Sequence, residues 1–224
     1  LIMATKQKEM IDGAAAIARG ALDAGCNFFA GYPITPASGI LAHMLRELPK
    51  VGGIGIQGED EISSIGHCIG AATAGATAFT ASSGPGLSLF SENIGLAIMM
   101  EIPLVIAISQ RLGPSTGAAT ATAQGDIQFM RWCTSGGYPI IVLSPTNIPE
   151  AYHLTKRAFK LARRFRCPVF IATDKETVMT TESVAESKML NDPDWPKIPD
   201  VAVGDALDPY QINGKIHHYT GSSH

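Results

Sequence analysis

Apolar residues gather in six short and nearly continuous runs along this 224-residue chain, each bounded by glycine, proline or small polar residues. The runs cover residues 26–32, 53–57, 77–82, 102–109, 138–144 and 167–174. A strand that is buried on both faces of a parallel sheet has such a continuous pattern, whereas a half-exposed strand alternates. Each run therefore predicts a buried parallel strand.

Segments with helical periodicity separate these runs. Before the first run, one apolar helical stripe contains Ile11, Ala14, Ala15, Ala18 and Leu22. Before the last run, a second stripe contains Ile148, Ala151, Tyr152, Thr155, Phe159 and Ala162. Spacings of three and four residues place side chains on one face of a helix. The alternation of strands and helices predicts an α/β fold with a doubly wound, mostly parallel sheet.

The last predicted helix also carries a basic face opposite its apolar stripe. This face contains Lys156, Arg157, Lys160, Arg163 and Arg164. A solvated surface is the usual meaning of such a charge pattern, and docking of an acidic electron carrier is the alternative.

The regular pattern ends after Thr181. Residues 191–209 contain four prolines and a tryptophan, and they show neither a helical nor an alternating period. Proline-rich segments of this kind favour extended backbone. We predict a first domain over residues 1–182 and an extended arm or linker over residues 183–224. We expect this arm to lead towards a second domain that is missing from the chain.

The composition excludes several classes of protein. A hydrophobic content of 46% supplies one sizeable core. With 17 basic and 20 acidic residues, the net charge of −3 leaves no broad basic surface for nucleic acid. No apolar run approaches the roughly 20 residues of a membrane helix, and the first residues lack the basic, apolar and small-residue order of a signal peptide. We expect a soluble, cytoplasmic protein.

The cysteines and histidines predict neither a disulfide framework nor a metal site. Cys26, Cys68, Cys133 and Cys167 lie far apart and never form a C-x-x-C pair. We interpret them as reduced and mostly buried. His217 and His218 lack further ligands at metal-binding spacing, which favours a surface pair.

Candidate chemistry lies in the loops that follow the first four predicted strands. These loops read PITP (residues 33–36), GEDE (58–61), SGPG (83–86) and QRLGPSTG (110–117). In an open parallel sheet, ligands bind beyond the carboxyl ends of the strands. We therefore expect all four loops to meet at one edge of the sheet.

The first of these loops is stiffened by two prolines. Pro33 and Pro36 fix their own φ angles and restrict the residues before them, so Thr35 has little conformational entropy to lose when a ligand binds. A second interpretation is that Pro36 begins a helix and Thr35 caps it. The two roles are compatible.

Three acids, Glu59, Asp60 and Glu61, occupy the second loop and the start of the predicted helix. Ordinary capping is one interpretation, because the helix dipole favours carboxylates there. The helix after Glu61 is small and apolar, however, and such surroundings would raise the pKa of a carboxyl group and let it share a proton. Acid–base chemistry is therefore the second interpretation.

The remaining two loops suggest a ring-binding pocket and an anion-binding arginine. The loop from Ser83 to Gly86 lacks the spacing and the lysine of a phosphate-binding loop, so packing against a flat ring is at least as favoured. Arg111 directly follows a buried strand. It either pairs with a local carboxylate such as Glu59 or Asp60, or holds the carboxylate of a substrate.

Four motifs in this order resemble the alpha subunit of the 2-oxoacid:ferredoxin (acceptor) oxidoreductases. They are GYPITPAS, QGEDEISSIGHCIGAATAGA, TASSGPGLSLFSENIGLAIMMEIPLVI and QRLGPSTG, and the resemblance spans residues 13–174. It implies the pyrimidine-binding half of a thiamine diphosphate site. A beta subunit would hold the diphosphate, Mg²⁺ and a [4Fe-4S] cluster, gamma and delta subunits would complete the assembly, and ferredoxin or a similar carrier would accept electrons. The implied reaction is oxidative decarboxylation of a 2-oxoacid with CoA, with 2-oxoglutarate as the first expectation.

The same resemblance assigns roles to individual residues. Glu61 would hydrogen-bond the aminopyrimidine ring, and it is preferred to Glu59 because nine residues separate it from Gly70, the family's spacing. Thr35 and Arg111 would orient the 2-oxoacid. The implied cofactor-binding set is Pro33, Ile34, Thr35, Glu61, Ser83, Gly84 and Pro85. The implied substrate side is Arg111, Ser115 and Thr116.

Departures from the family pattern occur near the substrate side, at Gly39, Leu112 and residues 119–121. They leave open which 2-oxoacid is used. Two further hypotheses also stay open: a non-oxidative thiamine diphosphate enzyme subunit, and a non-catalytic assembly domain of the same fold.

Overall fold

The computed structural model describes residues 8–197, and its centre is a six-stranded parallel sheet. The strands are β2 (Phe28–Gly31), β3 (Ile54–Gln57), β4 (Ala78–Ser82), β5 (Val105–Gln110), β6 (Ile141–Leu143) and β7 (Val169–Asp174). Their order in the sheet is β3-β2-β4-β5-β7-β6, and every neighbouring pair is parallel. Each predicted run overlaps one of these strands, and β5 extends one residue beyond its run, so the predicted sheet is confirmed.

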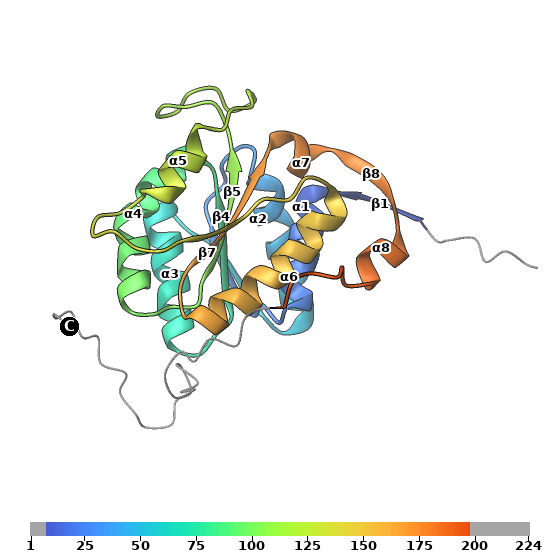
Figure 1. The fold of residues 1–224 in the computed structure, drawn as a ribbon, viewed down its shortest axis with the longest axis horizontal. Helices are drawn as coiled ribbons and strands as arrows, with labels where there is room; N and C mark the ends of the chain where they lie inside the picture. Colours follow the sequence, from blue (N-terminus) through green and yellow to red (C-terminus); the bar gives the residue numbers. More distant parts are fainter. Residues whose placement is uncertain (1–7, 198–224) are drawn as a thin grey trace, which may run out of the picture.

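Helices cover both faces of the sheet and form a three-layer α/β fold (Figure 1). One layer contains α1 (Gly13–Asp23), α2 (Ser38–Glu47) and α6 (Ile148–Phe165). The other contains α3 (Glu61–Thr73), α4 (Gly84–Met99) and α5 (Gly125–Arg131). A short 3₁₀ helix, η1 (Leu48–Val51), leads from α2 to β3. The predicted doubly wound α/β fold is thereby confirmed.

The two apolar cores explain why the strand runs are continuous. Val105 and Ala107 of β5 pack into the core on the α1 side, whereas Ile106 and Ile108 pack into the core on the α3 side. Successive side chains of a strand point to opposite faces, so a strand covered on both faces needs apolar residues at every position.

The first helix differs from its prediction. Ile11 belongs to a strand, β1 (Lys8–Asp12), and α1 begins at Gly13 because the Asp12 carboxylate accepts a hydrogen bond from the Ala15 N–H at 2.7 Å. Ile17, outside the predicted stripe, is fully buried. The helix packs against both α6 and α2, so a wider face is buried than one stripe provides. In contrast, all six residues of the predicted α6 stripe are buried, which confirms that prediction.

The chain after β7 packs beside the first layer of helices. It forms α7 (Lys175–Met179), β8 (Thr181–Ala185) and α8 (Glu186–Leu190), and β8 pairs antiparallel with β1. Segment 191–197 then contacts the basic face of α6, where Lys156 Nζ binds Asp192 at 2.9 Å and Arg157 donates to the Pro196 carbonyl at 2.8 Å. Part of that face is therefore covered by the chain itself. The predicted boundary at residue 182 lies within β8, and residues 198–224 of the predicted arm are outside the described range.

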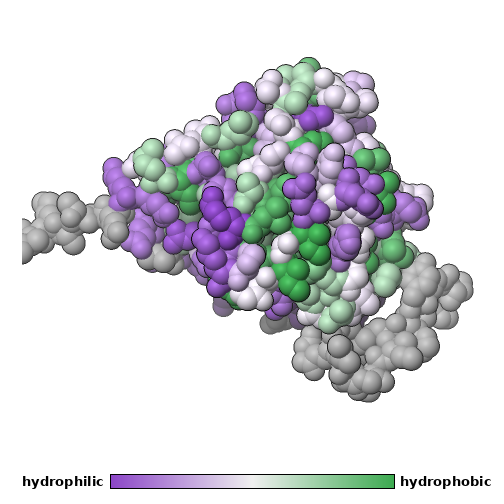
Figure 2. Space-filling view, turned by 180° about the vertical axis from the view of Figure 1, so that it is seen from behind, coloured by the Kyte–Doolittle hydropathy of each residue, from purple (hydrophilic) through white to green (hydrophobic). Residues whose placement is uncertain are grey.

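Large apolar side chains are exposed on the α3–α4 side and beside the edge strand β3. Figure 2, the view from behind, shows apolar residues gathered near the middle of the face that it presents. The exposed apolar residues of α3 and α4 are Ile62, Leu89, Leu96 and Met99, and those at and before β3 are Val51 and Ile54. Within residues 8–197, no helix combines the length and apolar character needed to cross a membrane.

Candidate active site

The four predicted loops meet at the carboxyl edge of the sheet. Arg111, the residue after β5, donates from Nη1 to the carbonyl oxygen of Thr35 at 2.8 Å. Gly58 donates its N–H to the carbonyl of Gly31 at 2.9 Å, which places the start of the acidic loop beside the end of β2. Glu61 in turn lies against Gly86. Parallel strands with their carboxyl ends at one edge account for this convergence.

Asp60 performs the capping that the acidic loop predicted. Its carboxylate accepts from the Ser63 N–H at 2.7 Å, and the Ser63 hydroxyl approaches the Asp60 N–H at 3.3 Å, which completes a reciprocal capping box. Glu61, the first residue of α3, is consequently not needed as the cap. Glu59 is exposed to solvent.

Glu61 is the buried carboxyl group of this edge. Only 6% of the residue is exposed. Burial raises the pKa of Glu61 above its usual value, and the neighbouring charge of Asp60 adds to this, while its own backbone N–H and the charge of Arg111 oppose it. The protonated form of this carboxyl group is therefore favoured relative to that of an exposed glutamate.

Gly86 makes the position of Glu61 possible. A Cβ atom at residue 86 would lie 1.9 Å from the Ser82 Oγ and 2.7 Å from the Glu61 Cγ. Both distances are far shorter than ordinary contacts between non-bonded atoms. The glycine in the first turn of α4 thus leaves the space that the Glu61 side chain fills.

Arg111 is also buried, with 6% exposed. Its Nη1 binds the Thr35 carbonyl, its Nη2 binds the Thr116 carbonyl at 2.9 Å, and its Nε–H has no partner among the described residues. It forms no ion pair with Glu59 or Asp60 within residues 8–197, so that interpretation is wrong. The guanidinium instead ties the proline turn to the loop after β5.

The proline turn does not begin a helix. Helix α2 starts at Ser38, and its N-cap is Ala37, without a side-chain cap. The interpretation in which Pro36 is the first helical residue and Thr35 caps it is therefore wrong. Residues 35–37 form a turn that leaves the Thr35 carbonyl free to accept from Arg111. Pro33 is exposed, and Ile34 is half-buried.

Unpaired hydroxyl groups lie at the ends of the central strands. Ser82, Ser83, Ser109 and Thr173 each have a buried hydroxyl oxygen without a hydrogen-bond partner among the described residues. An unmade hydrogen bond of this kind costs about 1–3 kcal/mol. Ser83 is the N-cap of α4 and Pro85 lies in its first turn, and this turn adjoins the buried carboxyl of Glu61. Buried polar groups without a partner among the described residues therefore gather at this turn.

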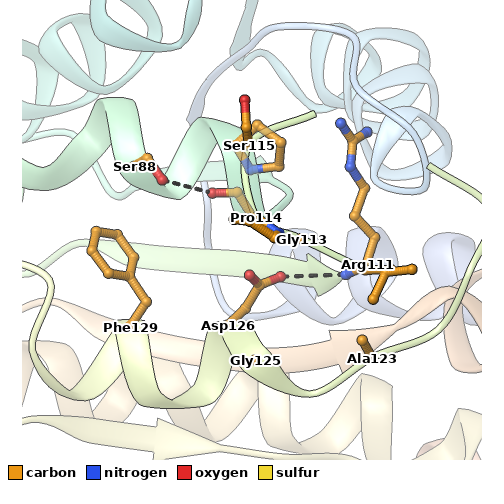
Figure 3. A pocket seen from close by; sticks show the side chains of 12 residues that line it. Ser88, Arg111, Gly113, Pro114, Ser115, Ala123, Gly125, Asp126 and Phe129 are labelled. Atoms are coloured by element: carbon orange, nitrogen blue, oxygen red, sulfur yellow. Dashed lines mark hydrogen bonds between the residues drawn. The ribbon is translucent and has the colours of Figure 1, made fainter. Parts of the chain in front are cut away.

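A cavity of about 430 Å³ opens between the first turn of α4 and the chain that leaves β5 (Figure 3). Its lining consists of Gly84, Pro85, Ser88, Arg111, Leu112, Gly113, Pro114, Ser115, Ala123, Gly125, Asp126 and Phe129. Of the predicted substrate-side residues, Arg111 and Ser115 line this cavity, whereas Thr116 contributes its carbonyl to Arg111. Of the predicted cofactor residues, Gly84 and Pro85 line it, while Pro33, Ile34, Thr35, Glu61 and Ser83 do not.

Asp126 is a member of this cavity that the sequence analysis missed. Its Oδ2 accepts a hydrogen bond from the Arg111 backbone N–H at 3.3 Å, and burial raises its pKa. Figure 3 shows the Arg111 side chain pointing away from Asp126 while the backbone faces it. Only topology could have indicated this residue, because the long connection that contains α5 leaves β5 at the carboxyl edge.

Comparison with known proteins gives consistent matches. Residues 19–222 match the family described as "Pyruvate flavodoxin/ferredoxin oxidoreductase, thiamine diP-bdg". The 2-oxoglutarate synthase subunit KorA of Archaeoglobus fulgidus is 46% identical over 218 residues, which cover 97% of this chain and 60% of that protein. The subunit of the same name from Methanocaldococcus jannaschii is 52% identical over 167 residues, covering 75% of this chain and 46% of that protein.

A solved structure has the same fold. It is described as 2-oxoglutarate:ferredoxin oxidoreductase from Magnetococcus marinus with 2-oxoglutarate, coenzyme A and succinyl-CoA bound. The TM-score is 0.78 at 37% identity, covering 80% of this chain and 31% of that one. The present chain thus spans less than two thirds of each of these proteins. It belongs to the pyruvate flavodoxin/ferredoxin oxidoreductase family, and the part that matches is the thiamine diphosphate-binding domain of that family.

Proposed function

We propose that this chain supplies the pyrimidine-binding half of a thiamine diphosphate site in a 2-oxoacid:ferredoxin oxidoreductase. The whole enzyme would oxidatively decarboxylate a 2-oxoacid, first of all 2-oxoglutarate, and form an acyl-CoA. The observation that carries the proposal is the buried carboxyl of Glu61, enclosed by Gly86 and set at the same edge as Arg111.

Each proposed residue has a physical task. Thiamine diphosphate, when bound, supplies a carbon nucleophile and an electron sink for decarboxylation. Glu61 would hold a proton on its carboxyl oxygen and share it with a ring nitrogen, a task that suits its raised pKa. The turn formed by Ser83, Gly84 and Pro85 would pack against the ring, together with the proline turn of Pro33 and Ile34.

Arg111 and Thr35 would orient the 2-oxoacid. The guanidinium already lies at the carboxyl edge, and its Nε–H has no partner within residues 8–197. A carboxylate matches the planar array of arginine donors. The Thr35 hydroxyl would add a hydrogen bond, and Ser115 and Thr116 would border the substrate. Holding the reacting carboxylate in a fixed orientation is the contribution expected of such a pair.

The named relatives are subunits, and this chain is expected to work within an assembly as well. A beta subunit would carry the diphosphate and Mg²⁺ site and a [4Fe-4S] cluster, with gamma and delta subunits and a ferredoxin-like carrier as further partners. The exposed apolar side chains of Ile62, Leu89 and Leu96 support a contact with another polypeptide. The part of the predicted arm after residue 197, a following domain and the cytoplasmic location stay predictions from the sequence.

The test uses the enzyme assembled with its native partners. Reduction of a viologen dye by 2-oxoglutarate, CoA and thiamine diphosphate is measured for the wild type, Glu61→Gln and the exposed control Glu59→Gln. Loss of the proton-sharing group should lower kcat about 10²–10⁴-fold, while the control should keep the wild-type rate. Normal turnover by Glu61→Gln would remove the proposed role.

Other results of the same assay would change the assignment. Aldehyde release without dye reduction would indicate a non-oxidative thiamine diphosphate enzyme. An assembled complex that binds no thiamine diphosphate would indicate a non-catalytic assembly domain.

A further inference from the structure

Asp126 connects two parts of the candidate site that come from different strands. Its Oδ2 accepts the backbone N–H of Arg111 at 3.3 Å, where the chain leaves β5. Its carboxylate also fills the space beside Gly84, where an added Cβ would lie 2.5 Å from Oδ1 and 2.7 Å from Oδ2. The carboxylate is therefore held between the exit of β5 and the first turn of α4.

We propose that Asp126 is a positioning residue for Arg111, whose main chain it fixes so that the guanidinium stays directed at Thr35. The side chain of Arg111 is held by the Thr35 and Thr116 carbonyls, and its backbone N–H is held by Asp126. These contacts fix both ends of the residue. A small rotation of the backbone at Arg111 would move the far end of this long side chain by about 1 Å, enough to impair orientation of a substrate.

The surroundings of Arg111 explain why an anchor is needed there. Residues 112–117 are all exposed, and within the described chain the loop is tied back mainly by hydrogen bonds between Leu112 and Ala118 and between Leu112 and Ala121. These bonds hold Leu112, and neither of them involves the N–H of Arg111 itself. Asp126 supplies the contact from the opposite side, through a helix that packs its Met130 into the α3-side core.

The charge of Asp126 also matters for the cavity. Arg111 is the one cation and Asp126 the one anion among the twelve lining residues. The Arg111 charge lies close enough to oppose the burial-induced rise in the pKa of Asp126. The Arg111 charge thus favours the charged form of Asp126. The inference rests on the proposed function, because it assumes that Arg111 binds the 2-oxoacid carboxylate.

The kinetic test compares variants in the assembled enzyme. Asp126→Ala removes the acceptor and should raise KM for the 2-oxoacid about tenfold, the factor for one lost hydrogen bond, with a smaller change in kcat. Asp126→Asn keeps an acceptor oxygen and should stay within about threefold of the wild-type KM. Gln128→Ala, an exposed residue of the same helix, is the matched control and should match the wild type.

A second variant tests the same contact in case Asp126→Ala does not assemble. Asp126→Glu keeps the charge but moves the carboxylate by one methylene group, and it should also raise KM. Wild-type KM in both Asp126→Ala and Asp126→Glu would overturn the inference.

A labelling experiment gives a readout that needs no turnover. Modification of Arg111 by phenylglyoxal, followed by peptide mass spectrometry of the assembled enzyme, should be faster in Asp126→Ala than in the wild type and near wild type in Asp126→Asn. If the wild type turns over no 2-oxoacid but this labelling pattern appears, the proposed function fails and the positioning role stands. If the wild type is active and the labelling of Asp126→Ala is unchanged, the positioning role fails and the proposed function stands.

Discussion

Gly86→Ala adds one methyl group against Ser82 and Glu61. The added Cβ would lie 1.9 Å from the Ser82 Oγ, 2.7 Å from the Glu61 Cγ and 3.0 Å from the Glu61 Oε1, so the Ser82 hydroxyl must also rotate away. Non-bonded carbon atoms normally approach to about 3.5–4.0 Å, so the Glu61 side chain must move by roughly 1 Å. A misplacement of that size near reacting groups lowers the rate about 10²-fold.

The expected change in stability is much smaller than the change in rate. Overpacking costs about 1–3 kcal/mol, and alanine in a helix regains about 1 kcal/mol relative to glycine. The net loss of about 0–2 kcal/mol lowers Tm by at most about 8 °C in a chain of this size. The variant should therefore assemble and still turn over slowly.

The assay measures kcat by dye reduction and Tm by thermal unfolding of the same assembled enzyme. Gly66→Ala is the control, because its Cβ would meet nothing within 4 Å on the exposed side of α3. The control should keep the wild-type kcat and gain about 0.5–1 kcal/mol of stability. A folded Gly86→Ala enzyme with wild-type kcat would refute the claim that turnover requires the Glu61 side chain in its present position against Gly86.

Three further outcomes are expected. Because burial raises the pKa of Glu61 above 4.5, its ionisation destabilises the fold, so in urea unfolding Glu61→Gln should be more stable than the wild type above that raised pKa, and the difference should vanish as pH falls below 4.5. Phe79→Ala removes a ring that packs 5.5 Å from Phe29 and 6.0 Å from Phe159, measured between centroids, and should lower the free energy of unfolding by about 3–5 kcal/mol in denaturant titration. Cys68 is fully buried and its thiol pKa is raised, whereas Cys167 is half-buried and its pKa is raised to about 11. Alkylation at pH 8 followed by mass spectrometry should therefore label Cys68 only after unfolding and later than Cys167. Early labelling of Cys68 would contradict its place in the core.

The central sheet was predictable because burial on both faces leaves a signal within each strand. The pairing of β1 with β8 left no such signal in the sequence. Each of these strands has one buried residue, Ile11 in β1 and Val184 in β8, and the remainder is exposed or half-buried. A single buried position gives neither an alternating nor a continuous apolar pattern, so the pairing depends on packing against the helices rather than on local sequence.

The site was predictable only in part, for a related reason. Loops that directly follow strands share one edge of the sheet, so the approach of Thr35, Glu61 and Arg111 follows from topology. The contact of Asp126 with Arg111 depends on how a connection of some fifteen residues folds back, which no periodicity encodes. The difference between Asp60 and Glu61 also required coordinates, because either acid suits the first turn of a helix.

Arg111 uses both of its terminal nitrogens on carbonyls of its own chain. A carboxylate that binds through those nitrogens must compete with the two carbonyls, and its observed affinity is reduced by the free energy of releasing them. The same exchange would release the turn at Thr35 and the loop at Thr116 together, so occupancy of one guanidinium would be communicated to two segments that are 81 residues apart in sequence.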